Sequence, residues 1–227
     1  MLAVIKKELK GYFLSPIGYI FIGLFLIMMS LIFSSEILNY YRTNNFEYIF
    51  FSGATVLTFV IPVITMRTFS EERKNGTEQL LVTSPLSLTK IVIAKFIAAT
   101  IVVIITEICT LLYFAVLSYF SMPNIPIALC TLLGFLLLAM AYISFGIFAS
   151  SITENQIVAF VITVGFFIAS WFLPKVSSIF DNFSLINIFS GFPYGQINIA
   201  DTVTMISFTV LCLILTIIVL QRRKSIQ

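Results

Sequence analysis

The charged side chains of this sequence gather in one short segment, where they could bind a partner protein. Eight of the 23 charged residues lie between Arg67 and Lys95, in a chain of 227 residues that is 59% hydrophobic. Charges of both signs in so apolar a chain form a pattern that can orient a partner and set its register. We therefore expect this segment to be presented to another molecule outside an apolar region.

Acid–base and metal chemistry have few candidate residues in this chain. There is no histidine, the commonest general base and metal ligand at neutral pH. The three cysteines, Cys109, Cys130 and Cys212, lie in apolar runs without ligand spacing. None of the ten glycines precedes a lysine, so the chain lacks the glycine-rich loop that cradles nucleotide phosphates. We predict no enzyme, no metal site and no cofactor in this chain.

Two features inside the apolar runs could bear on function. Glu107 places a carboxylate near the middle of the run 91–120, where burial in a membrane is costly. It either lines a cavity that touches substrate, or it locks helices together through a hydrogen bond to a neighbouring Thr or Ser. Gly146 and Ser150 are four residues apart, a small-residue spacing that allows two helices to approach closely.

The elements that must position these residues are membrane-spanning helices. The mean hydropathy is +1.08 and only 10% of the residues are charged, too few for the surface of a soluble domain of this length. A spanning helix needs about 20 predominantly apolar residues. Six segments meet this condition: 16–35, 48–66, 91–120, 127–150, 156–173 and 202–221. The fold class is therefore an all-α membrane protein with one transmembrane domain, residues 1–227.

The distribution of lysine and arginine predicts the orientation of these spans. With six spans, both termini lie on one side of the membrane, together with the segment 67–90. That side receives eleven of the 13 basic residues, and the other side receives Arg42 and Lys175. Basic residues are enriched in cytoplasmic loops, so both termini and the segment 67–90 are expected in the cytoplasm.

Two further segments flank the spans. In residues 1–14, Val4, Ile5 and Leu9 share one side of a helix and the lysines favour the other, which predicts an amphipathic helix on the membrane surface. The external segment 174–201 is too short for two spans and too apolar for a solvated loop. We expect it to form a partly helical hairpin in or dipping into the outer interface; the alternative is a loop packed on the bundle.

The first half of the segment 67–90 carries signals for a short helix. Ser70 could cap its N-terminus, and Glu71 and Glu72 suit the positive end of the helix dipole. Asn75 and Gly76 would end the helix, because glycine tolerates the left-handed conformation that such an end requires.

The second half carries signals for another short helix. Thr77 could cap it, Glu78 lies in its first turn, and Leu80 and Leu81 form its apolar part until Ser84–Pro85 interrupts it. The two halves together predict a helix–turn–helix, which we call the coupling elbow (residues 67–90). The apolar side chains of its leucines must be buried, either against the rest of the bundle or against a partner.

These residues resemble a known family. The runs 69–81 and 83–87, followed by Lys95, look like the signature of type 2 ABC exporter permeases. The stretches 150–156 and 195–201 are similar to the gliding-motility-type branch of that family. The number of spans, the lysine-rich start and the basic tail also match, so the resemblance covers the whole chain.

The resemblance implies that the coupling elbow docks on a separate ATPase subunit, which would bind ATP and Mg²⁺. Flanking charges would set the register, and Leu80 and Leu81 would supply buried area. The implied interface residues are Glu71, Glu72, Arg73, Gly76, Thr77, Glu78, Leu80 and Leu81, with a second cytoplasmic contact at Thr153, Glu154 and Asn155.

The family further implies an exporter in the cell (plasma) membrane, of which this chain forms half of the translocation pathway. A second copy or a related permease would supply the other half; an accessory extracytoplasmic subunit is a further partner, and nucleic acid is not. Two alternatives stay open: an ABC-like complex with a mechanical or assembly role, and a stand-alone secondary transporter. The substrate cannot be read from the sequence.

Overall fold

Helices form the framework of the chain. The computed structural model describes residues 1–38, 46–77, 87–120, 124–176 and 184–224, and these residues contain no strand. In this part of the chain, six helices are long and apolar enough to cross a membrane, as predicted. They are α2 (Pro16–Leu38), α3 (Phe46–Thr65), α6 (Leu88–Phe120), α7 (Ile125–Ile152), α8 (Gln156–Val176) and α10 (Ile199–Lys224).

The helices extend beyond the apolar segments that reveal them. α6 begins at Leu88, before the apolar run that opens at residue 91, and α10 begins at Ile199. α8 continues through Pro174 to Val176. Backbone hydrogen bonds continue a helix through polar residues such as Thr89 and Lys90, so hydropathy marks the membrane-embedded part of each helix and not its ends.

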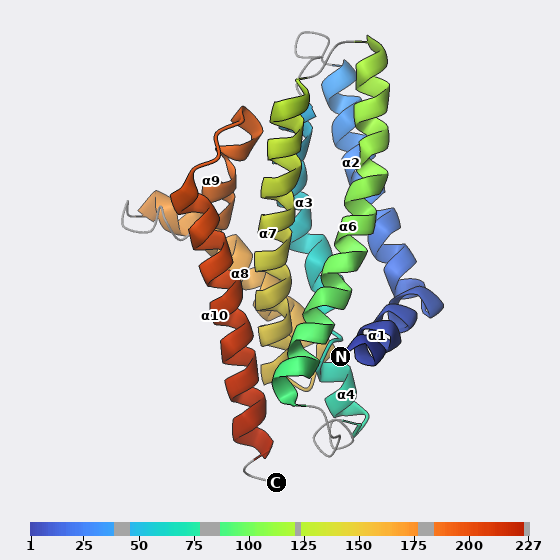
Figure 1. The fold of residues 1–227 in the computed structure, drawn as a ribbon, viewed down its shortest axis with the longest axis vertical. Coiled ribbons are helices and arrows are strands. Elements are labelled where there is room, and N and C mark those ends of the chain that lie inside the picture. Colours follow the sequence, from blue (N-terminus) through green and yellow to red (C-terminus); the bar gives the residue numbers. More distant parts are fainter. Residues whose placement is uncertain (39–45, 78–86, 121–123, 177–183, 225–227) are drawn as a thin grey trace.

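Helix α7 occupies the centre of the bundle (Figure 1). It contacts α3, α6, α8 and α10, and its buried residues are spread around its circumference. Phe135 on α7 packs against Phe25 of α2 and Phe50 of α3, with ring centroids 5.9 and 5.1 Å apart. The outward faces of α8 and α10, in contrast, expose apolar side chains such as Ile157 and Leu211, as expected for surfaces that face lipid.

The external segment between α8 and α10 packs on the bundle through residues 184–193, whereas residues 194–198 are exposed. It contains the short helix α9 (Leu185–Phe189) and the 3₁₀ turn η2 (Phe192–Tyr194), which ends at Gly195 with φ = 73°. Phe192 lies against Gly134 of α7, where any side chain would overlap its ring. The partly helical character was expected, and the position of the segment relative to the membrane interface stays a prediction.

Helix α1 (Leu2–Leu14) is separate from α2. Ser15 between them is extended, with φ = −95° and ψ = 159°, so α1 runs at an angle to the spans (Figure 1). Val4, Ile5 and Leu9 are half-buried and the three lysines are exposed, which confirms the amphipathic pattern. One face of α1 therefore packs against the protein and the other is charged.

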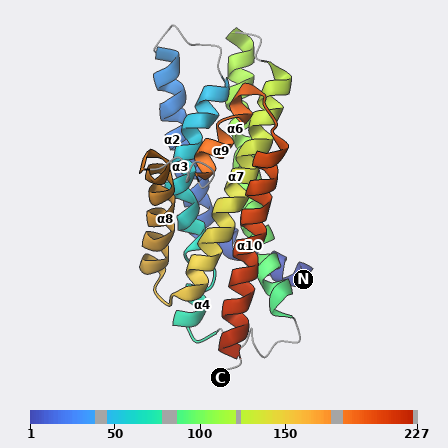
Figure 2. The same ribbon diagram turned by 90° about the vertical axis from the view of Figure 1, so that its left-hand side faces the viewer.

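Both chain ends lie at the same end of the bundle. The N-terminus with α1, the start of α6, the end of α10 and the short helix α4 (Ser70–Lys74) all gather there, at the lower end in Figures 1 and 2. This is the end that carries the basic residues of α1, α4 and α10.

Candidate functional site

Helix α4 forms the described half of the coupling elbow. It follows a turn after α3 and ends at Asn75, as the sequence predicts. Gly76 has φ = 71°, a left-handed conformation that glycine adopts without strain. The amide of Thr77 then donates to the carbonyl oxygen of Glu72 at 2.8 Å, which closes the end of the helix. The second predicted helix, with its break at Ser84–Pro85, lies outside the described residues.

The prediction that Ser70 caps α4 is wrong. Ser70 lies inside the helix and is buried, and its hydroxyl donates to the carbonyl oxygen of Met66. The cap comes from another helix: the hydroxyl oxygen of Ser150, near the end of α7, accepts from the amides of Phe69 at 3.0 Å and Ser70 at 3.1 Å. The same hydroxyl donates to the oxygen of Met66. The start of α4 is therefore bonded directly to α7.

Arg73 makes the second link between α4 and α7. Its guanidinium donates to the carbonyl oxygens of Ser151 at 2.8 Å and Ile152 at 3.3 Å. These carbonyls belong to the last turn of α7, where the helix leaves acceptors unsatisfied and a positive charge is favoured. Arg223 of α10 also donates to the oxygen of Ile152, at 2.9 Å.

Lys95 on α6 lies at the centre of a buried ion-pair cluster. Its side chain is only 1% exposed, and its ammonium nitrogen lies 2.9 Å from Glu72 Oε1 and 3.1 Å from Glu8 Oε1. The ammonium also donates to the carbonyl oxygen of Thr68 at 2.8 Å and lies 5.0 Å from the centre of the Phe69 ring. We call these residues, Lys95, Glu72, Glu8, Thr68 and Phe69, the Lys95 cluster.

The cluster connects three helices that are distant in sequence. Glu8 belongs to α1, Glu72 to α4, and Lys95 to α6. At its edge, the ammonium of Lys7 lies 3.7 Å from Glu72. Tyr12 of α1 is buried and forms a hydrogen bond with the Thr68 side chain. Burial, together with the negative charge of Glu8, raises the pKa of Tyr12 above the usual range. The Tyr12 hydroxyl therefore stays protonated.

The predicted interface residues fall into three groups. Glu72 points into the Lys95 cluster and Arg73 toward α7, while Gly76 and Thr77 are exposed and Glu71 is half-buried. The remaining members, Glu78, Leu80 and Leu81, lie outside the described residues.

The second predicted contact joins α7 to α8. Glu154 and Asn155 are exposed, and the Asn155 side chain accepts from the amide of Ile157 at 2.9 Å, at the start of α8. Thr153 follows the carbonyls that bind Arg73 and Arg223. The structure therefore brings this loop next to α4, a proximity that the sequence does not reveal.

Two residues of the site, Glu8 and Tyr12, were not selected from the sequence for a structural role. Glu8 contacts Lys95 from 87 positions away and Tyr12 lies beside Thr68, and no local pattern marks such contacts. Glu8 does carry one weak signal, since it is an acidic residue on an otherwise basic amphipathic helix.

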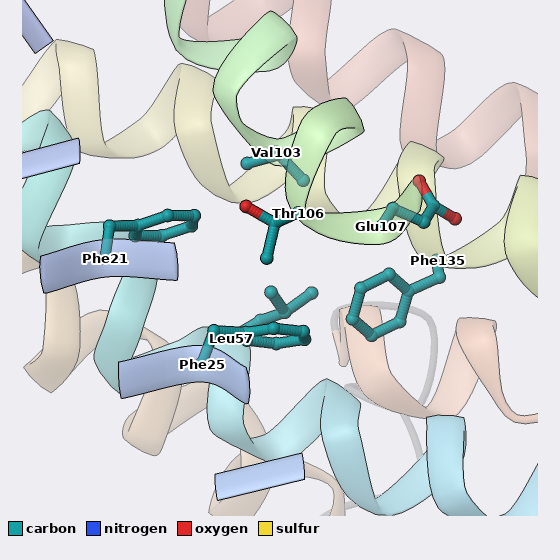
Figure 3. Close-up of a pocket in the computed structure, with 7 residues that line it drawn as sticks. All are labelled: Phe21, Phe25, Leu57, Val103, Thr106, Glu107 and Phe135. Carbon is teal, nitrogen blue, oxygen red and sulfur yellow. The ribbon is translucent and has the colours of Figure 1, made fainter. Parts of the chain in front are cut away.

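Glu107 lies on α6 at the edge of a tight apolar space between four helices (Figure 3). The space is too narrow for a water molecule, and its other lining residues are Phe21, Phe25, Leu57, Val103, Thr106 and Phe135. The side chain is 9% exposed, and Oε1 has no hydrogen-bond partner among the described residues. The predicted hydrogen bond to a neighbouring Thr or Ser is therefore not made by this oxygen.

These features define a class of protein. It is a membrane protein with six spanning helices in its described residues, and a short helix at one end of the bundle is bonded to the spanning helices α6 and α7. Comparison with protein families assigns the chain within that class. The model of the ABC-2 family transporter proteins matches residues 33–220, and the chain belongs to this family. No curated protein matches the chain by sequence. The chain is a transmembrane subunit of an ABC transporter, and membership of the family implies an ABC ATPase subunit as its partner.

Proposed function

We propose that this chain forms half of the pathway of an ABC exporter and receives the motion of its ATPase through the coupling elbow. A docking element transmits movement only if it is fixed to the helices that must move. The main observation in support of this proposal is that α4 is bonded to α7 through Ser150 and Arg73, and to α6 through Lys95. A displacement of α4 would therefore shift the ends of two spans.

The orientation and partners follow from the same proposal. The end that carries α4 faces the cytoplasm, where the ATPase binds ATP and Mg²⁺, and the basic residues at that end agree with this side. A second permease copy completes the pathway in the plasma membrane. Leu80 and Leu81 supply the apolar contact to the ATPase, with Glu71, Gly76, Thr77 and Glu78 beside them. The loop of Thr153, Glu154 and Asn155 forms the second contact.

Purification of the chain from its native host, through an epitope inserted between α6 and α7, tests this proposal. We expect an ATPase at one copy per permease chain. Replacing Leu80 and Leu81 by alanine should release it. The matched control is the double replacement of Leu111 and Leu112 on α6, a neighbouring leucine pair that is 41% and 70% exposed on the apolar surface. The proposal is wrong if no ATPase accompanies the wild type, or if both double variants retain it equally.

A further inference from the structure

The polar contacts around Lys95 suggest a role for α1 that the family assignment does not include. We propose that Lys95 is a positioning residue that joins α1 and α4 to the start of α6, so that α1 moves together with the coupling elbow. The functional part of this proposal rests on the proposed function of α4. Its structural part can be tested without any ATPase.

The burial of Lys95 shows how strongly the cluster constrains its members. An ammonium group that is 1% exposed is stable only when charges and hydrogen bonds replace its water shell. Glu72, Glu8 and the Thr68 carbonyl supply these partners. Any movement of α1 away from α4 would take a carboxylate away from the Lys95 ammonium. The cluster therefore favours the arrangement in which α1, α4 and the start of α6 stay together.

The connection between α1 and α2 makes this link necessary. Ser15 is extended, so no continuous helix sets the angle of α1 relative to the spans. The angle must come from tertiary contacts. The polar ones on the elbow side are Glu8 with Lys95, Lys7 with Glu72, and Tyr12 with Thr68.

The consequence is that α1 is part of the element that receives the ATPase motion. When α4 is displaced, Glu72 carries Lys95 and Glu8 with it, and α1 tilts or slides on the membrane surface. Because Lys6, Lys7 and Lys10 are exposed on α1, this motion would occur against the charged headgroups of the inner leaflet.

A spin-label distance between α1 and α4 tests the structural part. Cysteines replace Lys10 and Lys74, which are both exposed, after Cys109, Cys130 and Cys212 have been changed to alanine. The full chain in lipid nanodiscs should give one narrow distance distribution. Lys95→Met should broaden it, and Lys95→Arg should restore most of the order because the positive charge returns.

Two further variants serve as controls for this measurement. Lys90→Met removes an exposed lysine from the same helix and should leave the distribution narrow. Glu8→Ala keeps the pair of Lys95 with Glu72 but removes the acceptor on α1, and it should broaden the distribution even if Lys95→Met fails to fold. The proposal is overturned if Glu8→Ala, or a folded Lys95→Met, gives the same distribution as Lys90→Met.

ATP turnover by the purified complex tests the functional part. The nucleotide site lies in the partner, so Lys95→Met should lower kcat severalfold and leave KM for ATP unchanged. Retention of the ATPase should also be unchanged, since the buried Lys95 side chain is not itself exposed to a partner. An unaltered kcat in a complex with a broadened distance distribution would overturn the functional part. If the proposed function itself is wrong, the result is different: the wild-type chain purifies without an ATPase.

Discussion

The hydroxyl oxygen of Ser150 lies 3.1 Å from the backbone nitrogen of Ser70, 80 positions away in the sequence. A serine near the end of one spanning helix thus caps a short helix that follows another. The cap is shared with the amide of Phe69, and the same hydroxyl donates to the carbonyl oxygen of Met66. One side chain therefore satisfies three backbone groups of the turn between α3 and α4.

Replacing Ser150 by alanine should loosen this turn. The variant leaves the two buried amides of Phe69 and Ser70 without their side-chain acceptor, which costs about 1–3 kcal/mol of stability, while the Met66 carbonyl keeps the Ser70 hydroxyl. A lower Tm in detergent and faster hydrogen exchange at Phe69 and Ser70 would report it. Ser151→Ala is the matched control, because that hydroxyl is equally buried but only donates back to Phe148 within α7. Equal effects of the two variants would contradict the capping role.

Replacing Arg73 by lysine should weaken the link between α4 and the end of α7. A lysine cannot donate to the carbonyls of Ser151 and Ile152 with the fork geometry of a guanidinium, and the loss of a charged hydrogen bond costs about 1.5–3 kcal/mol. Hydrogen exchange in the loop 153–155 should become faster. Arg222→Lys, at an exposed position at the same end of the bundle, should not change it. Unchanged exchange in Arg73→Lys would argue against the link.

Gly146 should be intolerant of any side chain. A Cβ at this position would overlap the side chain of Thr65, which is buried at the end of α3. Gly146→Ala should therefore destabilise the protein by about 1–3 kcal/mol, as overpacking does. Gly165→Ala on α8 meets no atom within 4 Å and should be neutral or stabilising by up to about 1 kcal/mol. Thermal unfolding of the two variants in the same detergent checks the prediction, which fails if Gly146→Ala is as stable as Gly165→Ala.

Replacing Glu107 by leucine should stabilise the folded chain. Oε1 of Glu107 is buried without a hydrogen bond from any described residue, and an unsatisfied polar group in an apolar site costs about 1–3 kcal/mol. A higher Tm for Glu107→Leu than for the wild type would confirm this. Glu154→Gln, at an exposed position, serves as the control for loss of a carboxylate. A lower Tm for Glu107→Leu would indicate that the carboxylate has a structural partner.

Local sequence signals predict the spanning helices and several turns, but they do not predict which side chains meet between these helices. The six spans, the two-sided pattern of α1 and the turn at Asn75–Gly76 follow from hydropathy, periodicity and the freedom of glycine. The Gly146–Ser150 spacing correctly indicates a close approach, but not that Thr65 and α4 are the neighbours.

The pairing of charges could not be predicted, because it depends on tertiary packing. The resemblance places Glu72 among the residues of the ATPase contact, and the structure directs its carboxylate to Lys95. Ser70 has the residue type of a cap, but it is the first residue of the helix itself and another helix supplies the capping hydroxyl. Both cases have the same cause: the partner of the polar residue lies 23 or more positions away in the sequence, where no local pattern marks it.

The location of both chain ends has a practical consequence for protein engineering. α1 and the end of α10 lie at the same end of the bundle as α4, so under the proposed function a polypeptide fused before α1 or after α10 would lie on the ATPase side. A single-chain version of the complex, with the ATPase joined by a short linker at either end, is compatible with this layout. A bulky affinity tag at either terminus would lie on that side as well. An epitope inserted between α6 and α7, at the opposite end of the bundle, would leave the proposed docking surface open.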